Sequence, residues 1–331
     1  MNSLNFWNSC RFDSSDTGGH YESYFQRANH PNRPLAFWIR YTIFSPKGRK
    51  GSAMGELWGI YFDGEAGQIT AVKEIIPFSE CKFSEIDLNV LIGTATLREG
   101  SLKGQATSNG SNLQWTLNFR GDEQPLLLLP EAFYGRKLPK AKALVGTPNA
   151  VYKGTLYVNG KEIVIQDWIG SQNHNWGSKH TDQYSWGQIA GFDNVPDAFL
   201  ECTTARIKVG PLWTPWLTFI VLRVGREEFA LNTPYQAIRA KGNFEYFTWN
   251  FDSRTPEVRI HGQIQAPKSV FNGLNYSNPP GGEKTCLNTK IASCKVTLEK
   301  KGQSSINLTT ENRAAFEILT NDQDHGILVV L

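Results

Sequence analysis

The sequence lacks the features that mark two large functional classes. Its 331 residues include 34 basic and 31 acidic side chains, so the net charge is only +3. The basic residues are scattered, and no cluster of them is typical of a nucleic-acid interface. No apolar run approaches the roughly 20 residues that a membrane-spanning helix needs, and the longest, residues 217–222, has the length of a strand. We therefore expect a protein that neither binds nucleic acid nor inserts stably into a membrane.

Cysteine is also scarce, with five residues at irregular spacing. An odd number at such spacing does not indicate a disulfide framework. The N-terminus shows no basic segment followed by an apolar run, which a secretion signal would need. We expect buried reduced thiols and a cytoplasmic location, although Cys286 and Cys294 could face each other on a hairpin. The chain also has no glycine-rich phosphate loop and no glycine-bracketed serine, and we expect no cofactor.

Helical periodicity is nearly absent, and most of the chain alternates with a period of two. Residues 35–45 and 55–63 are rich in β-branched and aromatic side chains, which favour strands. Asn159-Gly160 lies between two alternating segments, and this dipeptide is a strong hairpin signal because both positions tolerate positive φ. Only residues 311–319 have a helical pattern. Since β-α-β units are missing, the pattern predicts an all-β sandwich or barrel.

Residues 167–188 combine large aromatic rings with hydrogen-bonding side chains. Such a mixture is typical of a concave ligand site, where aromatic walls surround a few polar groups. Tyr184, Trp186 and Gln188 share one face of a predicted strand. The tryptophans could instead be platforms for a sugar. The ligand-binding residues that we predict are Trp168, Asn173, Asn175, Trp176, Tyr184, Trp186 and Gln188.

Two carboxyl groups are candidates for proton transfer. Asp167 alternates with Ile163 and Ile165, and Glu201 alternates with Phe199. We therefore expect both carboxyls in apolar surroundings, where burial raises the pKa of a carboxyl group toward neutral pH. Either could then donate a proton to a ligand. The alternative is that each forms a structural hydrogen bond with a neighbouring strand or an indole N–H.

His174, between Asn173 and Asn175, is the third catalytic candidate. An imidazole there could act as a general acid or base. Alternatively, the Asn-His-Asn segment ties a crossover between domains together by bonding backbone amides. The spacing of His174, His180 and Asp182 matches none of the compact zinc patterns, and we expect no metal.

Three segments resemble a known family. Asn173-His-Asn-Trp-Gly177 resembles the Asp-His-Gln-Trp-Gly motif of carotenoid 1,2-hydratase and related AttH-type proteins. Residues 274–292 resemble these and also tocopherol-cyclase-like proteins, and residues 19–25 extend the similarity toward the N-terminus. The resemblance implies two consecutive lipocalin-like antiparallel β-barrels, which we assign to residues 1–178 and 179–331. The helical pattern of residues 311–319 adds a short helix near the C-terminus. The ligand site would lie in the barrels or between them.

The resemblance also implies an activity on large apolar molecules. Members of this group hydrate or cyclise isoprenoids, or close rings in polyenes, without a redox cofactor. Asn173 stands where the motif has its proton-donating Asp, and an amide cannot protonate an alkene. Asp167, His174 or Glu201 could replace that acid, or the site could only shape its ligand. Three functions follow as hypotheses: an isomerase or cyclase, a non-catalytic lipid or isoprenoid carrier, and a carbohydrate-binding or carbohydrate-active protein. The oligomeric state is not predicted.

Overall fold

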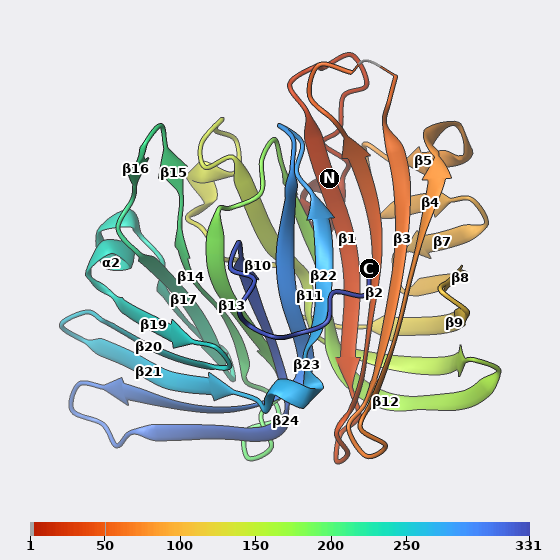
Figure 1. The fold of residues 1–331 in the computed structure, drawn as a ribbon. Helices are drawn as coiled ribbons and strands as arrows, with labels where there is room; N and C mark the ends of the chain where they lie inside the picture. Colours follow the sequence, from red (N-terminus) through yellow and green to blue (C-terminus); the bar gives the residue numbers. More distant parts are fainter. Residues whose placement is uncertain (1–2, 50) are drawn as a thin grey trace.

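The computed structural model describes residues 3–49 and 51–331, and it consists of two curved antiparallel sheets that lie side by side (Figure 1). The predicted fold class, two consecutive lipocalin-like β-barrels, is confirmed. Met1 and Asn2, the first residues of the segment in which we expected no secretion signal, lie outside the described residues. In the described part of the chain, no helix combines the length and the hydropathy that crossing a bilayer would take.

The first sheet has the strand order β4-β3-β2-β1-β12-β11-β9-β8-β7-β6-β5, and β10 pairs with β11. A short helix, α1 (Ser3–Asn8), precedes it. The strands are β1 (His20–Asn29), β2 (Leu35–Ser45), β3 (Met54–Asp63), β4 (Gln68–Pro77), β5 (Cys81–Phe83), β6 (Asn89–Ile92), β7 (Ala95–Arg98), β8 (Ser101–Ser108), β9 (Ser111–Arg120), β10 (Leu126–Leu127), β11 (Ala141–Val158) and β12 (Lys161–Gly177).

The second sheet has the order β18-β17-β14-β13-β24-β23-β21-β20-β19, and β22 pairs with β23. A separate hairpin is formed by β15 (Lys208–Val209) and β16 (Leu212–Trp213), and α2 (Pro234–Arg239) packs near β17. The sheet contains β13 (Gln183–Ala190), β14 (Phe199–Arg206), β17 (Leu217–Val224), β18 (Glu227–Leu231), β19 (Lys241–Glu245), β20 (Thr248–Arg254), β21 (Val258–Gln265), β22 (Asn272–Ser277), β23 (Glu283–Lys300) and β24 (Ile306–Thr320).

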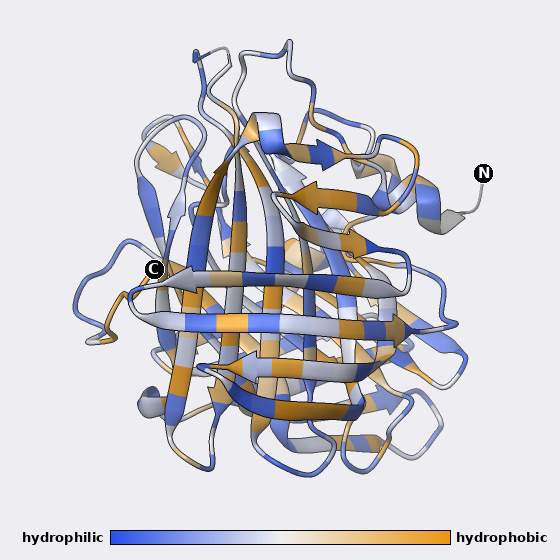
Figure 2. Cartoon of the chain, turned by 90° about the vertical axis from the view of Figure 1, so that its right-hand side faces the viewer, coloured by the Kyte–Doolittle hydropathy of each residue, from blue (hydrophilic) through white to orange (hydrophobic). Residues whose placement is uncertain are grey.

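The first sheet curls until its edge strand β4 reaches β8 in the other half of the sheet. The backbone N–H of Lys73 in β4 donates to Ser108 Oγ at 3.0 Å, and Thr107 N–H in β8 donates to Glu74 Oε1 at 2.8 Å. Figure 2 shows later strands of this sheet crossing the long ones, with apolar and polar segments alternating along them. The inward residues form one core, in which the Trp115 indole donates to Tyr41 Oη at 2.9 Å. The predicted alternation therefore separates an apolar interior from solvent.

One part of the first sheet is covered on both faces. Every residue of β2 is buried, because its inner face lines the barrel and its outer face packs against the second sheet. Trp38 of β2 and Trp58 of β3 lie on the outer face of the first sheet. They join Tyr276 and Leu319 of the second sheet in a shared apolar cluster. The contact between the barrels is thus built from large side chains on the outside of β1, β2 and β3.

Two local predictions have opposite outcomes. The Asn159-Gly160 hairpin is confirmed, since Val158 pairs with Lys161 and both turn residues have positive φ. The predicted helix at residues 311–319 is wrong, because these residues belong to β24, which pairs with both β13 and β23. Pairing on two sides satisfies the backbone groups, and residues 313–320 are also buried on both faces of the strand. Together these outweigh a weak helical pattern.

The chain passes from one sheet to the other at residues 178–182. β12 ends at Gly177 and β13 begins at Gln183, so all strands of the first sheet precede Ser178 and all strands of the second sheet follow it. The assignment of residues 1–178 and 179–331 to two domains stays a prediction from the sequence.

Close approach of backbones makes Gly170 in β12 sensitive to substitution. A Cβ there would overlap the Arg27 carbonyl oxygen of the neighbouring strand β1. Because the obstacle is backbone, no side-chain rotation relieves it, and we expect Gly170→Ala to lower the free energy of unfolding by about 3 kcal/mol. Urea denaturation measures this. Gly135→Ala is the control, since a Cβ there meets nothing within 4 Å; an equal, small effect of both variants would contradict the prediction.

Candidate functional site

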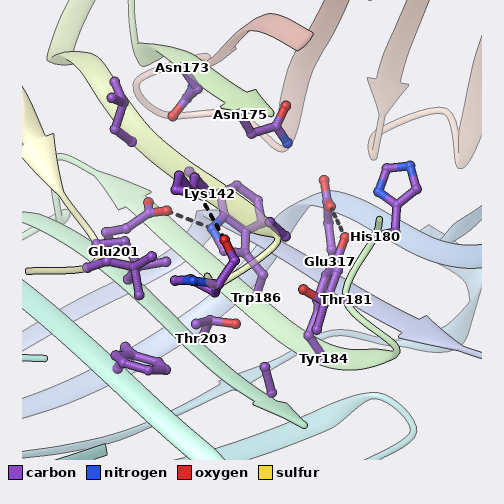
Figure 3. A pocket seen from close by; sticks show the side chains of 18 of the residues that line it. Lys142, Asn173, Asn175, His180, Thr181, Tyr184, Trp186, Glu201, Thr203 and Glu317 are labelled. Carbon is purple, nitrogen blue, oxygen red and sulfur yellow. Dashed lines mark hydrogen bonds between the residues drawn. The ribbon is translucent and has the colours of Figure 1, made fainter. Parts of the chain in front are cut away.

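A pocket of about 230 Å³ lies between the two sheets. The outer face of the first sheet forms one wall, and the second sheet forms the other (Figure 3). Most of its surface is aromatic or aliphatic, with a few polar groups among the rings. The main aromatic residues that line it are Tyr21, Phe25, Trp38, Tyr184, Trp186, Phe219 and Tyr276.

Glu201 is a buried acid in the wall of this pocket, and its side chain comes from β14. The residue is 2% exposed, so its predicted burial is confirmed. Trp186 Nε1–H donates to Oε1 at 2.7 Å, and Gln188 Nε2–H donates to Oε2 at 2.8 Å. Burial, only partly offset by these two hydrogen bonds and by the nearby Arg27, raises the pKa of Glu201 to about 7. A carboxyl with this pKa carries its proton in about half of the molecules at neutral pH.

Gln188 on β13 connects the two sheets through a network of polar groups. Its Oε1 accepts from Arg27 Nε at 2.7 Å and from Ser171 Oγ at 2.6 Å. Its Nε2 donates to Asn173 Oδ1 at 2.7 Å as well as to Glu201. Both atoms of the amide are therefore used, and its orientation is fixed. This orientation points an N–H at each of its two acceptors.

Several of the residues predicted from the sequence meet at the pocket. Asn173, Asn175, Tyr184, Trp186 and Glu201 line it, and Gln188 lies directly behind them. Asn173 and Asn175 come from β12, and the others come from β13 and β14, so their meeting depends on how the sheets pack. Asn175 Oδ1 has no hydrogen-bond donor among the described residues. The roles of these residues in binding remain a proposal.

A second acid of the pocket, Glu317 on β24, was not predicted. The fully buried Lys290 donates to its Oε1 at 2.7 Å, and Tyr184 Oη donates to its Oε2 at 3.4 Å. Burial lowers the pKa of Lys290, and the neighbouring Glu317 opposes this. Figure 3 shows Glu317 and Tyr184 on one side of the pocket and Glu201 on the other. The charge of Glu317 is thus balanced by an ion pair, whereas Glu201 has no such partner within hydrogen-bonding distance among the described residues.

His174 occupies a different place from the one predicted for a catalytic base. It contributes to the pocket wall, but both ring nitrogens are occupied. Nδ1 donates to the Trp7 carbonyl at 2.8 Å, and Nε2 contacts Glu22 Oε1 at 2.8 Å. The ring also stacks on Tyr24 with centroids 4.3 Å apart. His174 thus has a structural role, but it ties the N-terminal segment to the first barrel rather than holding a crossover between the domains.

Glu22 on β1 is the centre of that tie. Besides His174, its carboxylate accepts from His20 Nε2 at 2.9 Å, Tyr24 Oη at 3.1 Å and the Arg11 backbone N–H at 2.9 Å. Burial alone would raise the pKa of Glu22, but the hydrogen bonds from His174 and His20 prevail and lower it to about 2. The carboxylate therefore stays ionised and holds residues before β1 against the barrel.

The structure corrects three further site predictions. Asp167 is exposed rather than in apolar surroundings: it pairs with Lys153 at 3.0 Å, and this lowers its pKa. The cause is a β-bulge, because Tyr152 pairs with Trp168 while the next residue, Lys153, pairs with Gln166. Asp167 is therefore the extra residue of the bulge, and its φ is 55°. Trp168 consequently points into the core of the first barrel, and it does not line the pocket.

Trp176 is the third of these residues. It lies on the same side of β12 as His174, with ring centroids 4.6 Å apart, and it contacts Tyr134. Like Trp168, it is not part of the pocket wall. Alternation along β12 turns the Trp176 side chain away from those of Asn173 and Asn175.

Sequence reasoning missed Arg27, Arg40, Lys290 and Glu317. All four are buried and charged, and each lies in a strand that is otherwise mostly buried. A charged residue inside such a strand was the available signal, since Arg, Lys and Glu are seldom buried without a partner. The spacing of residues along the sequence did not indicate which residues would be their partners.

Known proteins share this architecture at low sequence identity. No family model matches the chain. An uncharacterized protein of Mycobacterium tuberculosis is 24% identical over 194 residues, which are 59% of this chain. The matched part spans 58% of that relative's length, less than two thirds of it.

Solved structures match over nearly the whole chain. An AttH protein from Nitrosomonas europaea has a TM-score of 0.58 at 13% identity, with 94% of this chain and 97% of that one covered. Kievitone hydratase from Nectria haematococca has a TM-score of 0.59 at 10% identity, with 98% and 94% covered. CghA with Sch210972 has a TM-score of 0.56 at 10% identity, with 95% and 94% covered. The chain has the fold of these lipocalin-like two-barrel proteins.

The Glu22 cluster gives the AttH-like fold of this chain a measurable acid sensitivity. The folded pKa of Glu22, about 2, lies below the ordinary value of 4.5. Its contribution to stability is therefore complete above pH 4.5 and is lost as the pH falls toward 2. The shift corresponds to about 3 kcal/mol. Wild type should lose this contribution on acidification, whereas Glu22→Gln should lack it at every pH; Glu99→Gln, on the surface, is the control. The free energy of unfolding, measured by denaturation at several pH values, tests this. The same dependence on pH in all three proteins would refute it.

Proposed function

We propose that this protein binds a large, mostly apolar small molecule in the pocket between its barrels and isomerises or cyclises it, with Glu201 as the proton donor. The observation that carries the proposal is the buried Glu201 carboxyl, whose pKa is raised to about 7 and which lines an aromatic pocket. The proposed ligand is an isoprenoid or a polyene, and no step needs a redox cofactor.

The surroundings of Glu201 suit proton transfer to an apolar ligand. Its protonated form is populated near neutral pH, and the side chain itself is almost fully buried. Trp186, Tyr184 and Phe219 present aromatic rings to the same space. The faces of aromatic rings attract cations, so these rings would stabilise positive charge that develops on a protonated alkene.

Structural neighbours are compatible with this proposal. One is named a hydratase, and another was crystallised with the small molecule Sch210972. Their low identity transfers the fold and not the reaction. The carbohydrate hypothesis is not favoured, because it needs exposed paired acids. Glu201 and Glu317 are both buried, and Glu317 is paired with Lys290.

A second candidate, a carrier for the same ligands, is favoured by one observation. Both oxygens of Glu201 already accept hydrogen bonds, from Trp186 and Gln188. A carboxyl held in this way would serve to fix the walls of the pocket. The first measurement is therefore native mass spectrometry of the purified protein, followed by solvent extraction of whatever is bound. A ligand that is unchanged after long incubation supports carriage, and a converted one supports catalysis.

Glu201→Gln separates binding from chemistry. The amide keeps the size of the side chain but cannot donate the proton of a carboxylic acid. Conversion of the extracted ligand should fall at least about 100-fold, while the amount of ligand that copurifies should stay close to that of wild type. Glu283→Gln, an exposed glutamate, is the control. Wild-type conversion by Glu201→Gln would remove Glu201 from the reaction.

The pH dependence of conversion should report the same group. Only protonated Glu201 donates, so the rate should be highest below pH 7 and fall by about tenfold for each pH unit well above it. Single-turnover measurements between pH 6 and pH 9 test this. A rate that rises with pH would mean that the ionised carboxylate acts as a base.

A further inference from the structure

One end of the pocket holds a hydrogen-bond donor that has no acceptor and a cation that has no carboxylate partner among the described residues. Trp38 is 2% exposed and lines the pocket, and its indole Nε1–H has no acceptor among the described residues. Arg40, two residues further along β2 and on the same face, is 5% exposed and lines the pocket as well. Its guanidinium carbon lies 5.9 Å from the centre of the Trp38 ring. The two donors therefore belong to one small region.

The charge of Arg40 is not balanced by a protein carboxylate. Its Nε and Nη2 both donate to Ser23 Oγ, at 2.9 and 2.7 Å, and it forms no ion pair within the described ranges 3–49 and 51–331. Nearby acids are occupied: Glu56 pairs with Lys73 at 3.1 Å, and Glu317 pairs with Lys290 at 2.7 Å. The guanidinium carbon of Arg40 lies 4.6 Å from the centre of the Tyr276 ring. This cation–π contact compensates the charge of Arg40 only in part.

His180 adds no second charge at this end. Its ring stacks on Tyr21 with centroids 3.9 Å apart and lies 5.7 Å from the ring of Tyr276. Burial, followed by the nearby Arg40, lowers the pKa of His180 to about 3, so the ring is neutral at pH 7. A buried cation without a partner is costly. An anionic group of a ligand would remove that cost and would also accept from Trp38.

We propose that the ligand is an amphipathic acid, whose carboxylate or other ionised oxygen binds Arg40 and the Trp38 indole N–H. This inference rests on the proposed function and narrows its substrate class. Figure 3 shows His180 and Glu201 on opposite sides of the pocket. Since Tyr276 contacts both His180 and Arg40, the acid group binds at the His180 end. The apolar body then extends along Trp186 toward Glu201, where the proton is delivered. Arg40 thus selects which end of the ligand meets Glu201.

The test compares cis-parinaric acid, a fluorescent polyene acid, with its methyl ester. The two have the same apolar chain and differ only in the charge of the head group. Wild type should bind the acid at least about tenfold more tightly than the ester, as expected of a hydrogen-bonded charge pair. Arg40→Met should remove this preference and leave ester binding unchanged, which also shows that the variant is folded. Trp38→Phe should reduce it while keeping the ring, and Arg98→Met, on the surface of the same sheet, should bind both probes like wild type.

The outcomes separate this inference from the function on which it rests. Equal affinity of wild type for acid and ester overturns the head-group assignment and leaves the apolar pocket in place. Binding of neither probe overturns the proposed function and the assignment with it. Lys142, the other buried cation of the pocket, donates to the Pro139 carbonyl at 2.9 Å. Loss of the preference in Lys142→Met, but not in Arg40→Met, overturns the assignment to Arg40.

Discussion

The site depends on one side chain, the amide of Gln188, which joins the two barrels. Arg27, Ser171 and Asn173 reach it from the first sheet, and Glu201 reaches it from the second. A buried polar network is stable only when its members find partners, so the sheets can pack in few other ways without leaving a donor or acceptor unsatisfied. The hydrophobic contact of the two sheets supplies attraction, and this network supplies the relative position.

The same network sets the chemistry of the pocket. Burial raises the pKa of Glu201, while Trp186, Gln188 and Arg27 limit the rise, so the carboxyl titrates near neutral pH. Arg27 itself is fully buried, and burial lowers its pKa to about 10, which still leaves it charged at neutral pH. A positive charge inside the contact thus limits the rise in the pKa of Glu201.

The difference from the AttH-type motif has a physical explanation in this arrangement. Asn173 Nδ2 donates to the carbonyl and the hydroxyl of Ser171, at 3.2 and 2.9 Å, and its Oδ1 accepts from Gln188. An aspartate could not donate to that carbonyl, and it would bring a second negative charge to the amide that already holds Glu201. In this chain the amide at position 173 is the better partner, and the acid of the pocket comes from β14.

The sequence alone determined the fold class, the Asn159-Gly160 turn and six pocket residues, because alternation and turn chemistry are local properties of the chain. Only the tertiary structure decided what each polar residue does. A single bulge turned Asp167 to solvent and Trp168 into the core, and pairing on both sides made residues 311–319 a strand. Arg40 and Glu317 became part of the site because two sheets, distant in sequence, pack face to face. The spacing of residues along the chain does not reveal which side chains that contact buries or which partners they find across it.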